Sequence, residues 1–80
     1  MSVLVLDGDL LPDVLGWAGD EEIYVVDPSA GRLERLERDA EDPRVFYLIG
    51  EPPVLPLPDD FVRIAVGDGV EPELGRVLRV

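Results

Sequence analysis

Four short apolar runs recur along the chain, and polar or proline-rich stretches separate them. They are Val3–Leu6, Ile23–Val26, Val45–Ile49 and Phe61–Val66. The first three are almost continuous in Val, Ile, Leu, Tyr and Phe, a pattern typical of strands buried on both faces of a parallel sheet. The fourth run contains an arginine and an alanine, so we expect it nearer an edge. The pattern predicts four strands in one sheet.

Helical patterns fill the intervals between and after these runs. Leu10–Trp17 is predicted to form a helix with Asp9 as its N-cap, because a short carboxylate satisfies free N–H groups of the first turn. A second helix is predicted after Asp27 or Ser29, either of which can cap it, since an apolar stripe recurs there at helical spacing. A third helix is predicted within residues 71–80, where a proline stands near the first helical position.

The alternation of strands and helices favours a parallel sheet with right-handed crossovers. The segment before the fourth strand, Gly50–Asp60, contains four prolines and is not expected to be helical. It could return the fourth strand as an antiparallel neighbour of the third, or carry it across to the first, which gives the order 3-2-1-4. The crossing covers about 22 Å, and eleven extended residues span up to about 36 Å, so we favour the crossing.

Composition limits the classes of function. The 80 residues are expected to form one domain, 1–80, and the net charge of −11 argues against binding nucleic acid or anionic membranes. Cysteine and histidine are absent, which removes disulfides, thiolate metal sites and the commonest general base. All basic residues are arginine, and Lys, Asn, Gln and Thr are missing, a skew that fits a GC-rich genome or a thermophile. We expect no metal site and no catalytic residue.

The chain also carries no targeting pattern. It has no basic leader, and no apolar run approaches the length of about 18 residues that a membrane span needs. We therefore expect a soluble, cytoplasmic protein.

Four strings follow one another with a spacing that carries further information: VLVLD at 3–7, IYVVDPSAGRLERLE at 23–37, RVFYLIGEPPVLPLPDDFV at 44–62 and LGRVLRV at 74–80. Together they resemble class I S-adenosylmethionine-dependent methyltransferases. They look like the first strand, the second strand with its helix, the third strand with the turn leading to the fourth, and the next helix. The resemblance implies an α/β, three-layer, Rossmann-like half-fold with four mainly parallel strands in the order 3-2-1-4 and three helices.

The resemblance also implies cofactor-binding positions. Asp7, Gly8 and Asp9 stand where the methionine end of S-adenosylmethionine would lie. Asp27, at the end of the second strand, stands where nucleotide-binding folds hold a ribose by its hydroxyls. Glu51 stands where the adenine amino group would be contacted. The simpler alternatives are that Asp27 caps a helix and that Glu51 is a solvated turn residue.

Two departures from the family pattern argue against catalysis. Where the family has a Gly-x-Gly-x-Gly loop, only Gly8 remains, and Leu10 and Leu11 follow; we expect these leucines to cover the sheet. The sequence stops at Val80, before the family's Pro-Gly-Gly turn, and looks like the N-terminal half of the fold. We expect a non-catalytic, methyltransferase-like domain that acts through protein contact or small-ligand binding. The alternative is a minimal S-adenosylmethionine-dependent methyltransferase whose pocket a second chain completes.

The half-fold predicts association, because it leaves an apolar face and an open strand edge. A twofold homodimer is the commonest solution for such a chain. We expect its interface to include apolar residues of the proline-rich segment, the fourth strand and the third helix. They are Val54, Leu55, Leu57, Val62, Ile64, Leu74, Val77 and Leu78.

Overall fold

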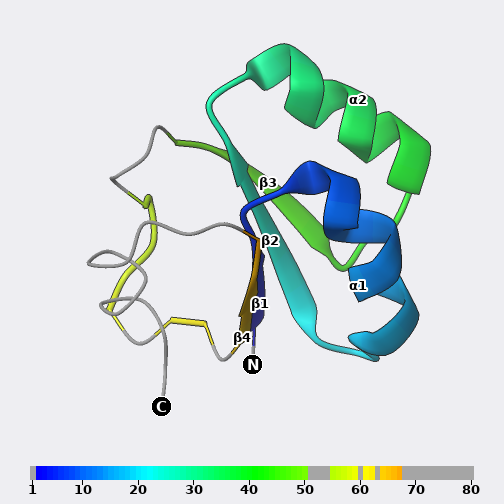
Figure 1. The fold of residues 1–80 in the computed structure, drawn as a ribbon, viewed down its shortest axis with the longest axis vertical. Helices are drawn as coiled ribbons and strands as arrows, with labels where there is room; N and C mark the ends of the chain where they lie inside the picture. The colour runs from blue at the N-terminus through cyan, green and yellow to red at the C-terminus, as the bar shows by residue number, and fades with distance from the viewer. Residues whose placement is uncertain (1, 51–54, 60, 63, 68–80) are drawn as a thin grey trace.

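The computed structural model describes residues 2–50, 55–59, 61–62 and 64–67. In this part of the chain, four parallel strands form one sheet in the order β3-β2-β1-β4 (Figure 1). The strands are β1 (Ser2–Val5), β2 (Glu22–Asp27), β3 (Val45–Ile49) and β4 (Ile64–Val66). β4 pairs with β1 in parallel, with Leu4 opposite Ala65. The predicted order is therefore confirmed, and the antiparallel pairing of the third and fourth strands does not form.

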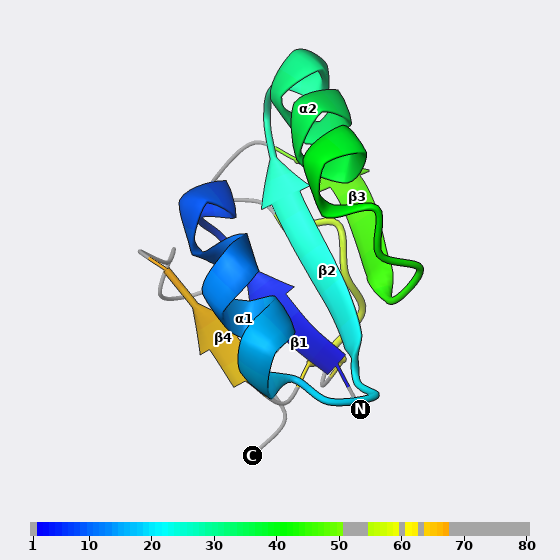
Figure 2. The ribbon, with the colours of Figure 1, turned by 90° about the vertical axis from the view of Figure 1, so that its right-hand side faces the viewer.

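Two α-helices cover one face of the sheet. They are α1 (Leu11–Trp17) and α2 (Ala30–Ala40), and a short 3-10 helix, η1 (Gly8–Leu10), precedes α1. Both helices lie on the same side because the two crossovers run in the same direction across the sheet (Figure 2). The third predicted helix, within 71–80, lies outside the described residues. Within the described part of the chain, neither helix has the length and apolar character needed to cross a membrane.

The start of α1 differs from the prediction. Asp7, rather than Asp9, is the N-cap of the helical segment, and its Oδ1 accepts a hydrogen bond from the Asp9 N–H at 3.0 Å. Asp7 has the extended backbone (φ −129°, ψ 109°) that an N-cap requires, whereas Asp9 already lies inside η1. The prediction of Asp9 as the cap was therefore wrong by two residues, and the helical segment begins at Gly8.

Each face of the sheet carries its own apolar core. On the helix face, Leu11 and Val14 of α1 and Leu33 of α2 pack on β-strand residues such as Val25. Leu11 is 2% exposed, which confirms that it covers the sheet. On the opposite face, the core consists of five buried residues, two from the strands and three from the segment that follows β3: Leu4, Val26, Leu55, Leu57 and Val62.

This second core corrects the expected dimer interface. Leu55, Leu57 and Val62 are 3%, 7% and 0% exposed within a single chain, so they have little surface left for a second copy. Leu55, Leu57 and Val62 thus cover the second face of their own sheet from segments that are not helical. Of the expected interface residues that the structure describes, only Ile64 remains exposed. Val54, Leu74, Val77 and Leu78 lie outside the described residues.

Arg44 joins the two helices at the amino ends of the strands. Its guanidinium donates to the backbone carbonyls of Gly19 and Leu15, at the C-terminal end of α1. The same group forms an ion pair with Asp42 at 2.8 Å, in the turn between α2 and β3. Hydrogen bonds from the Arg44 side chain and backbone lower the pKa of Asp42 to about 2. Arg44 therefore ties the end of α1 to the start of β3.

Candidate functional site

The carboxyl ends of β1 and β2 open at the same edge of the sheet, which is where open α/β sheets bind ligands. Asp7 follows β1 by two positions, and Asp27 is the last residue of β2. Gly50 follows β3 directly, and its N–H donates to the Asp27 carbonyl at 3.2 Å. The structure thus brings Asp7, Gly8 and Asp27 to one edge, as predicted, while Glu51 lies outside the described residues. We call this region the carboxyl edge.

Asp27 is already engaged by its own chain. Its Oδ1 accepts a hydrogen bond from the Ser29 N–H at 2.8 Å, and its Oδ2 lies 3.6 Å from Arg32 Nε. Ser29, rather than Asp27, is the N-cap of α2, because its Oγ accepts from the Arg32 N–H at 3.3 Å. Asp27 therefore shapes the turn that leads into α2. A ribose at this carboxylate would compete with the Ser29 N–H and with the guanidinium of Arg32.

Arg32 also lies at the carboxyl edge, and the sequence analysis did not identify it as a site residue. Its guanidinium lies between two carboxylates, 3.5 Å from Asp9 Oδ1 and 3.6 Å from Asp27 Oδ2. A signal was present in the sequence, because Arg32 stands in the first turn of its helix. The helix dipole disfavours a positive charge there, so an arginine at this position calls for a nearby acidic partner. Two such acidic residues, Asp9 and Asp27, precede Arg32 along the chain.

Gly8, the remaining glycine of the family's loop, is covered by a side chain. Gly8 is buried, and a Cβ at this position would lie 2.5 Å from Leu36 Cδ1 of α2. In cofactor loops, glycine lets the backbone approach the ligand. Here the space in front of Gly8 is occupied by Leu36.

Gly67 follows β4 directly and lies beside the loop after β1, at the point where the strand order reverses. Its φ of +103° is available mainly to glycine, and a Cβ would lie 2.9 Å from the Asp7 backbone nitrogen. The Leu6 N–H donates to the Val66 carbonyl at 2.9 Å and holds the two strand ends together. The end of β4 therefore packs against the loop after β1, where such folds usually admit a ligand.

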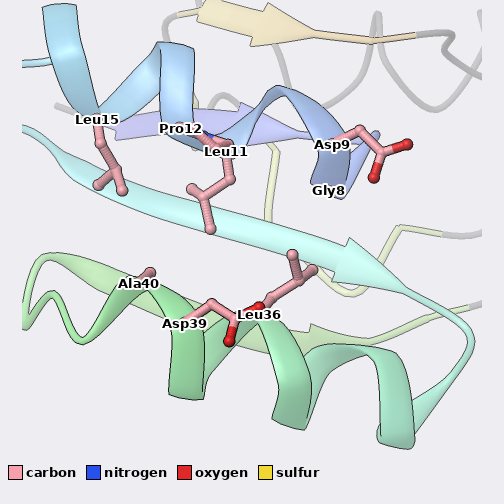
Figure 3. A pocket seen from close by; sticks show the side chains of 8 residues that line it. All are labelled: Gly8, Asp9, Leu11, Pro12, Leu15, Leu36, Asp39 and Ala40. Carbon is pink, nitrogen blue, oxygen red and sulfur yellow. The ribbon is translucent and has the colours of Figure 1, made fainter.

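Two hollows flank the carboxyl edge on the helix face. The first has a volume of about 360 Å³, and Figure 3 shows Leu11 and Leu36 projecting into the space between α1 and α2. Its lining is Gly8, Asp9, Leu11, Pro12, Leu15, Leu36, Asp39 and Ala40. The second, of about 580 Å³, lies at the N-terminal half of α2. Its lining is Asp9, Ser29, Gly31, Arg32, Arg35, Leu36 and Asp39.

The charges at the carboxyl edge favour a cationic ligand over an anionic one. Asp7, Asp9 and Asp27 contribute three carboxylates, and Arg32 contributes one guanidinium close to two of them. An ammonium or sulfonium group would be attracted here, while a phosphate or carboxylate would be repelled. Within the described residues, no three potential ligands cluster closely enough to hold a metal ion.

The opposite face of the sheet carries an aromatic cluster. Tyr24 stacks on Phe46 with ring centroids 5.2 Å apart and meets Phe61 edge-on at 5.0 Å. Burial and a 2.6 Å hydrogen bond to Glu22 raise the pKa of Tyr24 to about 12. Tyr24 and Phe61 are partly buried against the second core, whereas Phe46 is 43% exposed. These groups are structural and present no reactive atom.

The fold and the carboxyl edge define an α/β protein with a Rossmann-like sheet arrangement. Comparisons of the chain with models of protein families, with curated proteins and with solved structures found no match.

Proposed function

We propose that this protein is a non-catalytic, methyltransferase-like domain that acts through contact with other protein chains, a second copy among them. The observation that supports this most directly is the packing of Gly67 against Asp7. The end of β4 lies so close to the loop after β1 that a Cβ on Gly67 would stand 2.9 Å from the Asp7 nitrogen, which leaves little room for a ligand between these two strand ends. Covering of Gly8 by Leu36 adds to the same argument.

These obstacles to ligand binding differ in the free energy that a ligand would need to remove them. The Asp27 side chain is only 13% exposed, but its ion pair with Arg32 is long, at 3.6 Å, and Arg32 is 47% exposed, so we expect a ligand to displace Arg32 at a cost of about 1 kcal/mol. The contact between Gly67 and Asp7 joins two backbones, one of which belongs to the strand end that the Leu6–Val66 hydrogen bond holds. A ligand there would have to separate β4 from β1. The backbone contact at Gly67 is therefore a greater obstacle to a bound ligand than the ion pair at Asp27.

Calorimetric titration with S-adenosylmethionine and S-adenosylhomocysteine tests this proposal. We expect no binding heat with either ligand at millimolar concentration. A dissociation constant below roughly 100 μM, lost in Asp27→Ala but retained in Asp13→Ala, would contradict the proposal. Asp13 is a suitable control because it is an exposed carboxylate on α1, away from the carboxyl edge.

A second candidate function is a minimal S-adenosylmethionine-dependent methyltransferase completed by a second chain. The observation in its favour is the pair of hollows beside Asp9, whose volumes of about 360 and 580 Å³ fall in the usual range of ligand sites. The acidic surroundings also suit a sulfonium. In this candidate the ligand would lie over α2 rather than between the ends of β1 and β4. Arg35→Glu, at the second hollow, would then change the dissociation constant, whereas Asp27→Ala would not.

A further inference from the structure

β3 is an edge strand without the usual protection against pairing. No described residue pairs with its outer side, and its five residues, VFYLI, include no charge and no proline. Two of its apolar side chains are strongly exposed, Phe46 at 43% and Ile49 at 62%. Exposed edge strands of soluble proteins usually carry a lysine, a proline or a bulge that blocks a second strand. β3 is therefore suited to pair with another strand.

The backbone of β3 presents its free groups in a definite pattern. The Gly50 N–H donates to the Asp27 carbonyl, and the Ile23 N–H donates to the Arg44 carbonyl. These bonds direct the even-numbered positions toward β2, so Val45, Tyr47 and Ile49 direct their N–H and C=O groups outward. The Val45 N–H is already bonded to the Asp42 carbonyl. Among the described residues, none bonds to the outward N–H groups of Tyr47 and Ile49 or to the outward carbonyls of Val45, Tyr47 and Ile49.

We propose that two copies of the chain pair through β3, antiparallel, about a twofold axis at Tyr47. In this register Tyr47 faces its own copy, and the two residues exchange N–H···O=C bonds as a hydrogen-bonded pair. Ile49 faces Val45 of the second copy, and each Ile49 N–H donates to a Val45 carbonyl. The free donors and acceptors of the edge therefore match their symmetry-related partners. The two sheets become one continuous sheet.

The side chains of β3 also fit the antiparallel register centred on Tyr47. Phe46 faces Leu48 of the second copy on the face opposite the helices, and Ile49 faces Val45 on the helix face. Apolar cross-strand pairs of this kind stabilise antiparallel sheets, while like charges directly opposite destabilise them. Each copy carries a net charge of −11, so two copies can approach closely only along an uncharged strip. β3 supplies such a strip.

The inference rests on the proposal that the protein works by association, and it selects β3 over the other edge. β4 has three residues, Ile64–Val66, and is followed by Gly67, whose φ of +103° departs from an extended strand. β3 has five residues and a longer row of groups to pair. Pairing through one continuous interface on each copy closes the assembly at two chains.

Sedimentation of the full chain tests the inference. We expect the wild type to sediment at twice the chain mass of 8.8 kDa at about 100 μM. Ile49→Lys places a charge in the strip, and Ile49→Pro removes a donated hydrogen bond; each is expected to weaken dimerisation at least about tenfold. The control is Ile64→Lys on β4, where Ile64 is 39% exposed; its dimer should persist.

The outcomes separate this inference from the proposed function. A monomeric wild type, or a dimer unaffected by both Ile49 variants, would overturn pairing through β3. Neither result would bear on the cofactor titration, which tests the proposed function by itself. Circular dichroism of each variant shows that the monomer is folded, so a loss of the dimer cannot be attributed to unfolding.

Disulfide formation tests the register directly, because the natural sequence has no cysteine. Phe46 and Leu48 of the second copy form a non-hydrogen-bonded pair with a Cα separation of about 4.5 Å, within reach of a disulfide. A mixture of Phe46→Cys and Leu48→Cys chains should therefore cross-link on mild oxidation. Phe46→Cys alone should cross-link poorly, since its two copies lie diagonally at about 7–8 Å. Equal cross-linking in both samples would overturn the register.

Discussion

Single residues decide what the carboxyl edge can bind. Arg32 neutralises part of the charge of Asp9 and Asp27, but its ion pairs, at 3.5 and 3.6 Å, are long and partly exposed. Gly67 acts through the backbone, because its positive φ brings β4 against Asp7 with no room for a Cβ. Of these residues, Gly67 has the larger influence on the shape of the site.

Replacing Gly67 by alanine should destabilise the protein. The substitution forces a side chain into a φ of +103° and places its Cβ 2.9 Å from the Asp7 nitrogen. We expect a loss of about 2 kcal/mol or more in the free energy of unfolding, measured with urea. Gly16→Ala is the matched control, because Gly16 lies inside α1 with open space around it; it should stabilise by about 0.5–1 kcal/mol. Equal stability of Gly67→Ala and the wild type would show that the end of β4 does not lie closely against Asp7.

At the scale of the elements, the strands and the helix starts were predictable to within a few residues, whereas the capping residues were not. Continuous apolar runs define the strands within two or three residues, and the length of the proline-rich segment correctly favoured the crossing of β4 to β1. Asp7 and Asp9 are equally good caps by composition, so only backbone angles identify Asp7. In the same way, Asp27 and Ser29 could not be distinguished, and Ser29 is the cap of α2.

The candidate site was predictable only in part, for a physical reason. The strand order places Asp7, Gly8 and Asp27 at one edge of the sheet, since each lies at or just after the carboxyl end of a parallel strand, while their role in binding a cofactor stays a prediction. The contact of Gly67 with Asp7 joins positions sixty residues apart, and no local pattern encodes it. The role of Arg32 at the carboxyl edge depends on a side-chain rotamer that brings its guanidinium close to two carboxylates at once. Local propensity and periodicity in the sequence therefore predicted the strands and helices. The contact of Gly67 with Asp7 could be seen only in the folded structure.

The connection that Arg44 makes between α1 and β3 should be visible in the pH dependence of stability. Asp42 has a folded pKa of about 2, below its ordinary value of 3.8, because Arg44 hydrogen-bonds to its carboxylate. The resulting stabilisation is complete above pH 3.8 and is lost as the pH falls toward 2. In Arg44→Ala, we expect a lower melting temperature at pH 6 and a smaller further decrease on acidification.

A second arginine variant separates the effect of losing the Asp42–Arg44 pair from the effect of losing a positive charge. Arg35→Ala removes a positive charge from the exposed surface of α2 and leaves Asp42 paired, so its acid profile should follow the wild type. Melting temperatures at about pH 6, 4 and 2, followed by circular dichroism, provide the comparison. Parallel profiles for the wild type and Arg44→Ala would mean that the Asp42–Arg44 pair contributes nothing to folding.

At the scale of the whole molecule, the chain covers part of the sheet itself and leaves the outer edge of β3 exposed. Gly67 lies against Asp7, Leu36 covers Gly8, and Leu55 and Leu57 pack on the second face of the sheet. The outer edge of β3 remains uncovered by the described residues and carries exposed apolar side chains. This distribution of surfaces is the basis of the proposed pairing of two copies through β3.

Sedimentation equilibrium of the wild type, with and without millimolar S-adenosylhomocysteine, tests this claim most directly. The account predicts a dimer of twice 8.8 kDa in both samples, with the same dissociation constant, because the nucleoside finds little room between the ends of β1 and β4 and plays no part in β3 pairing. A monomer in both samples, or a dimer that forms only when the nucleoside is present, would contradict it.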